Sequence, residues 1–241
     1  MTESFAEKMK AGTRELNITL SQRQLEQFFK YYEMLVETNK VMNLTAITEF
    51  DEVVEKHFLD SVSLTKQMDL HQPLKVLDLG TGAAFPGIPL KIVFPELEIT
   101  LMDSLNKRVL FLQDVISSLQ LENIEAVHGR AEEAARNKKY RESFDLCVSR
   151  AVANISTLSE YCLPFVKIGG SFISYKSSTI EDELEDGKKG IAILGGKVKD
   201  VYKFTLPDSE LQRSFVIIEK EKKTPKAYPR KAGTPSKEPL H

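Results

Sequence analysis

The sequence predicts an α/β fold: a mostly parallel β-sheet covered by helices, with a helical segment in front of it. Two observations carry this prediction. From Pro73 onward, short apolar runs alternate with amphipathic segments, which is the pattern of a parallel sheet with helices on both faces. In addition, the first of these runs ends in a glycine-containing turn, V-L-D-L-G-T-G-A-A-F-P-G over residues 76–87. The end of such a strand is where open α/β sheets bind nucleotide-like ligands.

Residues 1–72 form the helical segment. Ser21 and Gln24 have the spacing of a capping box, which marks the start of a helix. A second amphipathic run begins at Val53. We expect a helical cap packed on the sheet, and a substrate-recognition arm is the alternative. The apolar stripe of the first helix recurs at three- and four-residue spacing and consists of Leu25, Phe28, Phe29, Tyr32, Leu35 and Val36.

Residues 73–220 are predicted to form the sheet domain. The last two apolar runs are joined by a short loop, so they can pair as an antiparallel hairpin. An antiparallel strand at one edge distinguishes the sheets of class I methyltransferases from those of dehydrogenases, so this ending favours a Rossmann-like methyltransferase fold. The seven strands are expected at 74–79, 98–103, 124–128, 144–149, 170–176, 197–204 and 214–219. The helices are expected at 86–93, 107–119, 130–137, 155–166 and 179–193.

Composition excludes several classes of protein. The formal net charge of −2 over 241 residues gives no global attraction for nucleic acid, so such affinity requires a local basic patch. Cys147 and Cys162 lie in apolar runs and read as buried hydrophobic residues rather than a disulfide. The histidines lack metal-ligand spacing, and no apolar stretch reaches the roughly 18 residues of a membrane span. We expect a monomeric cytoplasmic protein that binds neither metal nor membrane.

Residues 221–241 form a basic tail. Seven basic residues and one acid, Glu221, lie between Lys220 and Lys237. A disordered, solvated end is the usual fate of such a segment. Tyr228, Pro229 and Gly233 instead suggest a specific turn with an aromatic ring that can stack. Both alternatives stay open at this point.

The glycine turn predicts the chemical class of the ligand. Gly80 and Gly82 allow the backbone to approach a ligand closely. Phe85 stands where the dinucleotide fingerprint G-x-G-x-x-G requires its third glycine. Asp78 places a carboxylate at the strand end, which would repel a pyrophosphate and attract a cation. The pattern D-x-G-x-G-x-A looks like the first motif of S-adenosylmethionine-dependent methyltransferases.

Further candidates follow the next strands. Asp103 ends the second strand, where a carboxylate can accept hydrogen bonds from a ribose diol, although it can also cap the next helix. Ala131 and Glu132 follow the third strand, at the loop that meets the adenine in methyltransferase sheets. Glu132 can equally be a first-turn acid favoured by the helix dipole.

The end of the fourth strand lacks the usual catalytic motifs. Residues 149–151 read S-R-A, without the N/D-P-P-Y of exocyclic-amine methyltransferases or the Pro-Cys of base C5 enzymes. Arg150 could bind a phosphate or the cofactor carboxylate, or stack on a base. No catalytic residue is assigned. No G-x-S-x-G elbow or Walker P-loop is present, which excludes those reactions.

With these residues in hand, the chain resembles the bacterial 16S ribosomal RNA guanine-N7 methyltransferase family, also called glucose-inhibited division protein B. The resemblance covers nearly the whole chain from about Leu20, and the tail motif makes it specific. Ala84 departs from the family, which commonly has glycine there. The shared segments are 43–47 (NLTAI), 57–61 (HFLDS), 78–88, 103–104, 107–108, 129–132 (GRAE), 149–151 and 228–240 (YPRKAGTPSKEPL).

The resemblance implies methyl transfer from S-adenosyl-L-methionine, leaving S-adenosyl-L-homocysteine, to a guanine N7 in 16S ribosomal RNA or the small ribosomal subunit. Guanine N7 carries a free lone pair, so no general base is obligatory. The alternatives are a methyltransferase acting on a protein or small molecule, a dinucleotide-dependent oxidoreductase, and a non-catalytic adaptor. The cofactor would lie against Asp78, Gly80, Gly82, Phe85, Asp103, Ala131, Glu132 and Arg150. The expected RNA contacts are Arg150, Lys176, Lys226, Tyr228, Arg230 and Lys231.

Overall fold

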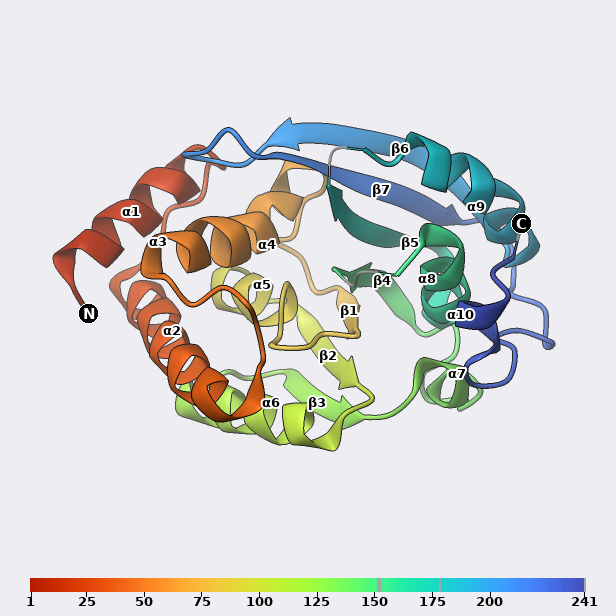
Figure 1. Cartoon of the computed structure of the whole chain (residues 1–241), viewed down its shortest axis with the longest axis horizontal. Coiled ribbons are helices and arrows are strands. Elements are labelled where there is room, and N and C mark those ends of the chain that lie inside the picture. Colours follow the sequence, from red (N-terminus) through yellow and green to blue (C-terminus); the bar gives the residue numbers. More distant parts are fainter. Residues whose placement is uncertain (151–152, 178, 241) are drawn as a thin grey trace.

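The chain forms a seven-stranded mixed sheet with helices on both faces (Figure 1). The computed structural model describes residues 1–150, 153–177 and 179–240. The strand order is β3-β2-β1-β4-β5-β7-β6, with β7 antiparallel to both of its neighbours and parallel pairing from β3 through β5. This confirms the predicted class of fold. The strands are β1 (Lys75–Leu79), β2 (Glu98–Asp103), β3 (Ile124–His128), β4 (Phe144–Ser149), β5 (Val166–Ser177), β6 (Gly196–Thr205) and β7 (Gln212–Lys220).

The direction in which the chain adds strands reverses at β1. From β1 it proceeds outward through β2 to β3, and then returns to place β4 on the other side of β1. The register pairs Leu79 with Met102, and Asp103 with His128. The carboxyl ends of these strands therefore meet at one edge of the sheet, at the switch point where doubly wound folds bind their ligands.

The cap consists of several helices that share their hydrophobic core with the sheet. Ser21 caps α2 with the reciprocal Gln24 contact of a capping box, as the sequence predicts. The rings of Phe58 and Phe85 lie 6.1 Å apart and join the cap to the glycine turn. The cap elements are α1 (Glu3–Arg14), α2 (Gln22–Met42), α3 (Phe50–Val53), a π-helical turn (Val54–Leu59), α4 (Asp60–Val62) and a 3₁₀ turn (Ser63–Lys66).

The helices of the sheet domain follow the prediction except at two places. The segment expected at 130–137 is helical only over four residues, after which the amides of Arg136 and Asn137 bond the carbonyls three residues back and the chain continues in turns. The helix expected at 155–166 ends at Cys162, since Pro164 cannot donate to a further turn. The helices are α5 (Gly87–Val93), α6 (Asn106–Ser118), α7 (Ala131–Ala134), α8 (Ile155–Cys162), α9 (Glu181–Ile193) and α10 (Thr234–Lys237).

The tail is ordered and folds back onto the sheet domain. In Figure 1 its single-turn helix α10 lies beside α8 and above α7, far from the cap helices α1 and α2. The Arg230 guanidinium binds the buried Glu160 carboxylate of α8. The alternative of a disordered end is therefore wrong over the residues described.

Two further observations concern the described residues as a whole. None of the helices there is long and apolar enough to cross a membrane. In the same part of the chain, no group of three or more His, Cys, Asp and Glu side chains could hold a metal ion. Cys147 and Cys162 are buried free thiols.

Candidate functional site

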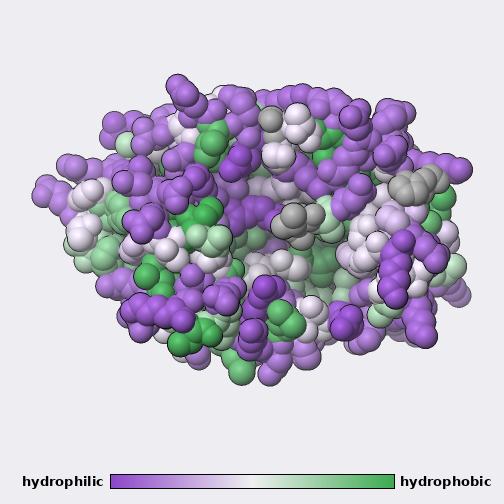
Figure 2. Space-filling view, in the orientation of Figure 1, coloured by the Kyte–Doolittle hydropathy of each residue, from purple (hydrophilic) through white to green (hydrophobic). Residues whose placement is uncertain are grey.

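A pocket of about 350 Å³ lies at the carboxyl ends of β1 to β4, within the range of about 300–1,000 Å³ usual for small-molecule sites. The same side of the molecule is hollowed near its centre in Figure 2, and the surrounding surface is mostly hydrophilic. The pocket is lined by Leu79, Gly80, Met102, Asp103, Ser104, Arg108, Gly129, Arg130, Ala131, Glu132, Ser149, Ala153, Leu158 and Tyr161.

The glycine turn after β1 is fixed to the end of β2. Gly80 and Gly82 both have positive φ, at 69° and 61°, a conformation that only glycine adopts freely. The amides of Gly80 and Thr81 donate to the Met102 carbonyl. Gly80 lines the pocket, whereas Gly82 is not among the lining residues, and a Cβ at Gly82 would meet no atom within 4 Å.

Asp78 holds the turn together from inside the protein. The carboxylate is fully buried, and its Oδ2 accepts bonds from Thr81 Oγ1 at 2.6 Å and Gly87 N at 2.8 Å. Its Oδ1 has no hydrogen-bond partner among the described residues. Burial raises the pKa of Asp78 to about 6. Asp78 is not among the lining residues, and it ties the turn to the start of α5.

Asp103 is the most firmly held side chain of the pocket wall. It is 3% exposed, and its Oδ2 accepts from Gly82 N at 3.0 Å while its Oδ1 accepts from Leu105 N at 2.9 Å. The Arg108 guanidinium lies 3.4 Å away. A carboxylate has about four lone-pair sites, so capacity for a ligand hydroxyl remains. The helix-cap alternative is wrong, because Leu105 is the N-cap of α6 and Asp103 accepts from its amide rather than from an amide inside the helix.

Ala131 and Glu132 lie at the start of α7, and both line the pocket. Glu132 is 7% exposed, and its Oε1 accepts a bond from Gly233 N at 3.0 Å. A residue of the tail therefore touches the back of the pocket wall, which the sequence pattern does not reveal.

Phe85 and Arg150, two of the predicted cofactor contacts, are not among the residues that line the pocket. The Arg150 guanidinium stacks on the Phe85 ring, with Cζ 4.9 Å from the ring centre. It donates to Asp60 Oδ2 at 3.0 Å and to His57 Nδ1 at 3.0 Å. Arg150 thus fastens the π-helical turn of the cap to the end of β4, and its charge is already paired.

His57 belongs to the same cluster and is neutral near physiological pH. Burial, followed by the nearby Arg150 charge, lowers the pKa of His57 to about 3. His57 Nδ1 lies 3.0 Å from Arg150 Nη2, which can only donate, and 3.1 Å from the Lys56 carbonyl, which can only accept, while Nε2 lies 2.9 Å from Thr45 Oγ1. Residue spacing gives no sign of this cluster, because its members are about 90 positions apart in the chain.

The predicted RNA contacts fall into two groups. Lys176 Nζ bonds the Glu183 carboxylate at 2.6 Å, and Arg230 binds Glu160 through three side-chain bonds of 2.7–3.1 Å. Both charges are therefore paired within the fold, and the phosphate contacts of these two residues stay predictions. Lys226 and Lys231 are exposed, and the half-buried Tyr228 packs against the core near α8.

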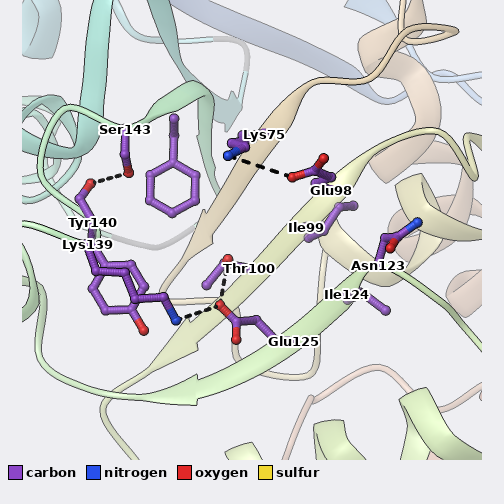
Figure 3. A pocket seen from close by; sticks show the side chains of 11 residues that line it. Lys75, Glu98, Ile99, Thr100, Asn123, Ile124, Glu125, Lys139, Tyr140 and Ser143 are labelled. Atoms are coloured by element: carbon purple, nitrogen blue, oxygen red, sulfur yellow. Dashed lines mark hydrogen bonds and ion pairs between the residues drawn. The ribbon is translucent and has the colours of Figure 1, made fainter.

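Another hollow, larger than this pocket, lies at the opposite ends of the strands. It has about 500 Å³ and includes residues from the starts of β1, β2 and β3. In Figure 3 its charged side chains point at one another: Lys75 at Glu98, and Lys139 at Glu125. Charges that pair across the hollow leave little for a charged ligand, and we do not regard it as the active site.

The carboxyl-end pocket fits S-adenosylmethionine. A buried carboxylate stands at the end of β2, where an adenosine ribose would meet it, and the Gly80 turn has no side chain to obstruct the ligand. Tyr161 and Leu158 of α8 supply an apolar wall. These two residues were missed in the sequence, where they read as part of an ordinary amphipathic helix.

Solved structures share this fold at low sequence identity. A mutant of MtNAS in complex with S-adenosylmethionine aligns with a TM-score of 0.55 at 15% identity, covering 80% of this chain and 76% of that one. The precorrin-6y C5,15-methyltransferase of Geobacter metallireducens aligns with a TM-score of 0.51 at 15% identity, covering 75% of this chain and 92% of that one. At such identity these likenesses establish the fold alone.

Sequence comparison establishes the family. The family model for rRNA small subunit methyltransferase G matches residues 24–215. Ribosomal RNA small subunit methyltransferase G of Lachnoclostridium phytofermentans is 54% identical over 95% of both chains. The protein of the same name from Exiguobacterium sp. is 51% identical over the full length of both. With one family model matching most of its length and relatives half identical throughout, this chain belongs to the rRNA small subunit methyltransferase G family.

Proposed function

We propose that this protein transfers the methyl group of S-adenosyl-L-methionine to a guanine N7 in 16S ribosomal RNA. The observation that carries the proposal is the pocket at the strand ends, where the Gly80 turn, the buried Asp103 carboxylate and the α7 wall converge in a member of this family. The cofactor supplies an electrophilic methyl group on a sulfonium. Asp103 holds the ribose hydroxyls, and Ala131 and Glu132 border the adenine.

Catalysis rests on orientation rather than on proton removal. Guanine N7 has a free lone pair at neutral pH, and holding it in line with the methyl group is a proximity effect. Two titratable groups near the pocket agree with this: His57 Nδ1 lies 3.0 Å from Arg150 Nη2, and the Asp78 carboxylate is fully buried and not part of the pocket lining. Neither is free to accept a substrate proton.

RNA would approach over the exposed cations around the pocket. Arg130 lines the pocket and is exposed. Lys226 and Lys231 are exposed on the tail, a few residues before Gly233, which bonds the pocket residue Glu132. Among the described residues, none of these three takes part in an ion pair within the protein. Phosphates bind such cations without sequence preference, and Tyr228 could stack on a base only if its packing opened.

The remaining parts of the proposal concern organisation. Residues 1–72 act as the cap that frames the substrate side, residues 73–220 bind the cofactor, and residues 221–241 support both. The protein acts as a monomer, which light scattering would check. Its site of action is the bacterial cytoplasm, where ribosomal RNA is assembled into subunits.

The test treats small ribosomal subunits from a strain lacking this protein with the purified enzyme and cofactor. Borohydride–aniline cleavage then maps N7-methylated guanines in the 16S RNA. We expect one new cleavage site, absent when Asp103→Ala replaces the wild-type protein. Tritiated cofactor offered to separated RNA and protein fractions provides the second measurement. Label in protein alone would favour the other methyltransferase reading, and no label in either would favour a non-catalytic adaptor.

A further inference from the structure

The tail from Thr224 to Leu240, hereafter the strap, crosses the back of the cofactor pocket without lining it. None of its described residues is among those that line the pocket. It nevertheless contacts two that do, Glu132 of α7 and Tyr161 of α8. The strap is therefore placed to control the shape of the pocket wall.

The strap is fastened away from the pocket by a buried ion pair. Glu160 has a side chain only 1% exposed, and Arg230 donates to both of its carboxylate oxygens through Nε and Nη2. The Arg230 backbone amide adds a bond of 2.7 Å to the same carboxylate. Breaking such a pair leaves an uncompensated buried charge, so this anchor is strong.

Further bonds hold the strap before and after this anchor. Arg141 donates to the carbonyls of Thr224 at 2.9 Å and Tyr228 at 3.0 Å. Thr157 of α8 donates to the Pro235 carbonyl at 3.1 Å. The strap is thus held by Arg141 and by α8 at several points, and its pocket contacts at Gly233 and Ser236 lie on either side of the Pro235 anchor.

The two pocket contacts are directional. The Gly233 amide donates to Glu132 Oε1 at 3.0 Å, and the Ser236 hydroxyl lies 2.8 Å from the Tyr161 hydroxyl. Glu132 belongs to a helix of four residues, which is too short to be stable without tertiary support. The strap supplies that support, because it fixes one carboxylate oxygen of Glu132 and the end of the Tyr161 ring.

We propose that the strap is a positioning element for the cofactor: Gly233 and Ser236 hold Glu132 and Tyr161 in the orientation that the adenosine half requires. The inference rests on the proposed function, since it takes this pocket as the cofactor site. It assigns the motif at residues 228–240 a role in cofactor affinity, in place of the phosphate binding expected for Arg230.

The test measures cofactor affinity by calorimetry with S-adenosylhomocysteine. Arg230→Met releases the anchor, and we expect its Kd to rise about tenfold because the wall is no longer preorganised. Ser236→Ala removes only the Tyr161 contact and should raise Kd about threefold, with Ser236→Thr restoring the wild-type value. Lys237→Ala is the matched control on the same helix and should bind as the wild type does.

Two measurements separate positioning from general stability. Phe204→Leu should lower the stability of the protein through β6, far from the pocket. At a loss of melting temperature similar to that of the strap variants, it should leave the Kd for S-adenosylhomocysteine unchanged. In methylation assays, Ser236→Ala should raise KM for the cofactor while kcat at saturating cofactor stays within about twofold.

The outcomes distinguish the inference from the function beneath it. Wild-type Kd in both folded variants, Arg230→Met and Ser236→Ala, would overturn the strap as a positioning element while leaving the methyltransferase function intact. An equal rise in Kd for Phe204→Leu would overturn it as well. Failure of the wild-type protein to bind S-adenosylhomocysteine would overturn the proposed function itself. If Arg230→Met does not fold, the Kd values of Ser236→Ala, Ser236→Thr and the control Lys237→Ala decide whether the strap positions the cofactor.

Discussion

Two hollows lie at opposite ends of β1, β2 and β3, and they differ in what holds their polar groups. At the amino ends, about 500 Å³ is bordered by Glu125 and Lys139, whose side chains are half or more exposed and pair with each other. At the carboxyl ends, about 350 Å³ is bordered by Asp103, which is buried and held by backbone amides. A buried carboxylate that backbone amides hold in one orientation is preorganised for a ligand. An exposed ion pair is solvated, and its two charges contribute little energy. Size is therefore a poorer guide to function here than the burial of polar groups.

The largest effect should come from the cluster that joins the cap to the carboxyl end. Arg150→Ala should lower the free energy of unfolding by about 3 kcal/mol, because Asp60 stays buried with Arg213, 3.5 Å away, as its one remaining ion-pair partner among the described residues. Urea denaturation measures this. Lys139→Ala, at the amino-end hollow, is the control and should stay within about 0.5 kcal/mol of the wild type. Equal losses of unfolding free energy in Arg150→Ala and Lys139→Ala would contradict the proposed difference between the two ends of the strands.

The second prediction compares the effect on ligand affinity of removing one carboxylate from each hollow. Asp103→Ala should raise the Kd for S-adenosylhomocysteine about 100-fold, since it would remove the charge-assisted bonds proposed for the ligand and loosen the Gly82 turn. Glu125→Ala should leave Kd within about twofold, because that side chain is exposed and distant from the carboxyl ends. Calorimetry decides, and a comparable loss in Glu125→Ala would mean that the amino-end hollow binds the ligand.

The third prediction concerns pH and Asp78. Because burial raises the pKa of Asp78 to about 6, the carboxyl is neutral below that pH and ionised above it. A cationic cofactor is attracted by the ionised form, so its affinity should rise about tenfold between pH 5 and pH 7, as for unit charges several ångströms apart in a protein. His57 does not titrate in this window, since its pKa is about 3.

Asp78→Asn is the matched variant for measuring cofactor affinity between pH 5 and pH 7. Its amide oxygen can still accept from Thr81 and Gly87, so the turn should persist while the charge is lost. The rise of affinity with pH should disappear in Asp78→Asn. If the variant kept the wild-type profile, another group would be responsible for it.

The smallest effect tests strain in the turn. Ala84 is buried and has φ of 73°, a conformation that costs a residue with a Cβ about 1–2 kcal/mol. Ala84→Gly should therefore stabilise the protein by about 0.5–1 kcal/mol, after the entropy lost by the more flexible unfolded chain is subtracted. Thermal unfolding measures it, and a destabilised Ala84→Gly would show that the methyl group packs more favourably than the backbone is strained.

The strands and the glycine turn were predictable because their signals are local. Apolar runs end at Asp103 and Ser149 in the structure as in the sequence, since each run is followed at once by polar or turn-forming residues. The departure at Ala84 was also visible, and the positive φ found there explains why glycine suits the position. The end of the helix at Cys162 was missed because the periodicity of the next segment continues through Pro164.

The partners of the charged residues were not predictable. Arg150, Lys176 and Arg230 read as free cations in the sequence, and each is paired in the fold. Arg150 bonds Asp60 across 90 positions, and Arg230 bonds Glu160 across 70. No spacing rule links residues so far apart, because only the packing of β4 and α8 against the cap and the strap brings them together.

The sequence by itself determined the class of fold, the glycine turn and the family, because each depends on residues that are neighbours along the chain or on a motif that is contiguous. Tertiary structure alone decided which charges stay available to a substrate. It also decided that the tail supports the pocket wall through Gly233. The physical reason is that an ion pair or hydrogen bond depends on distance in space, and the chain reaches those distances only after the sheet has brought its strand ends to one edge.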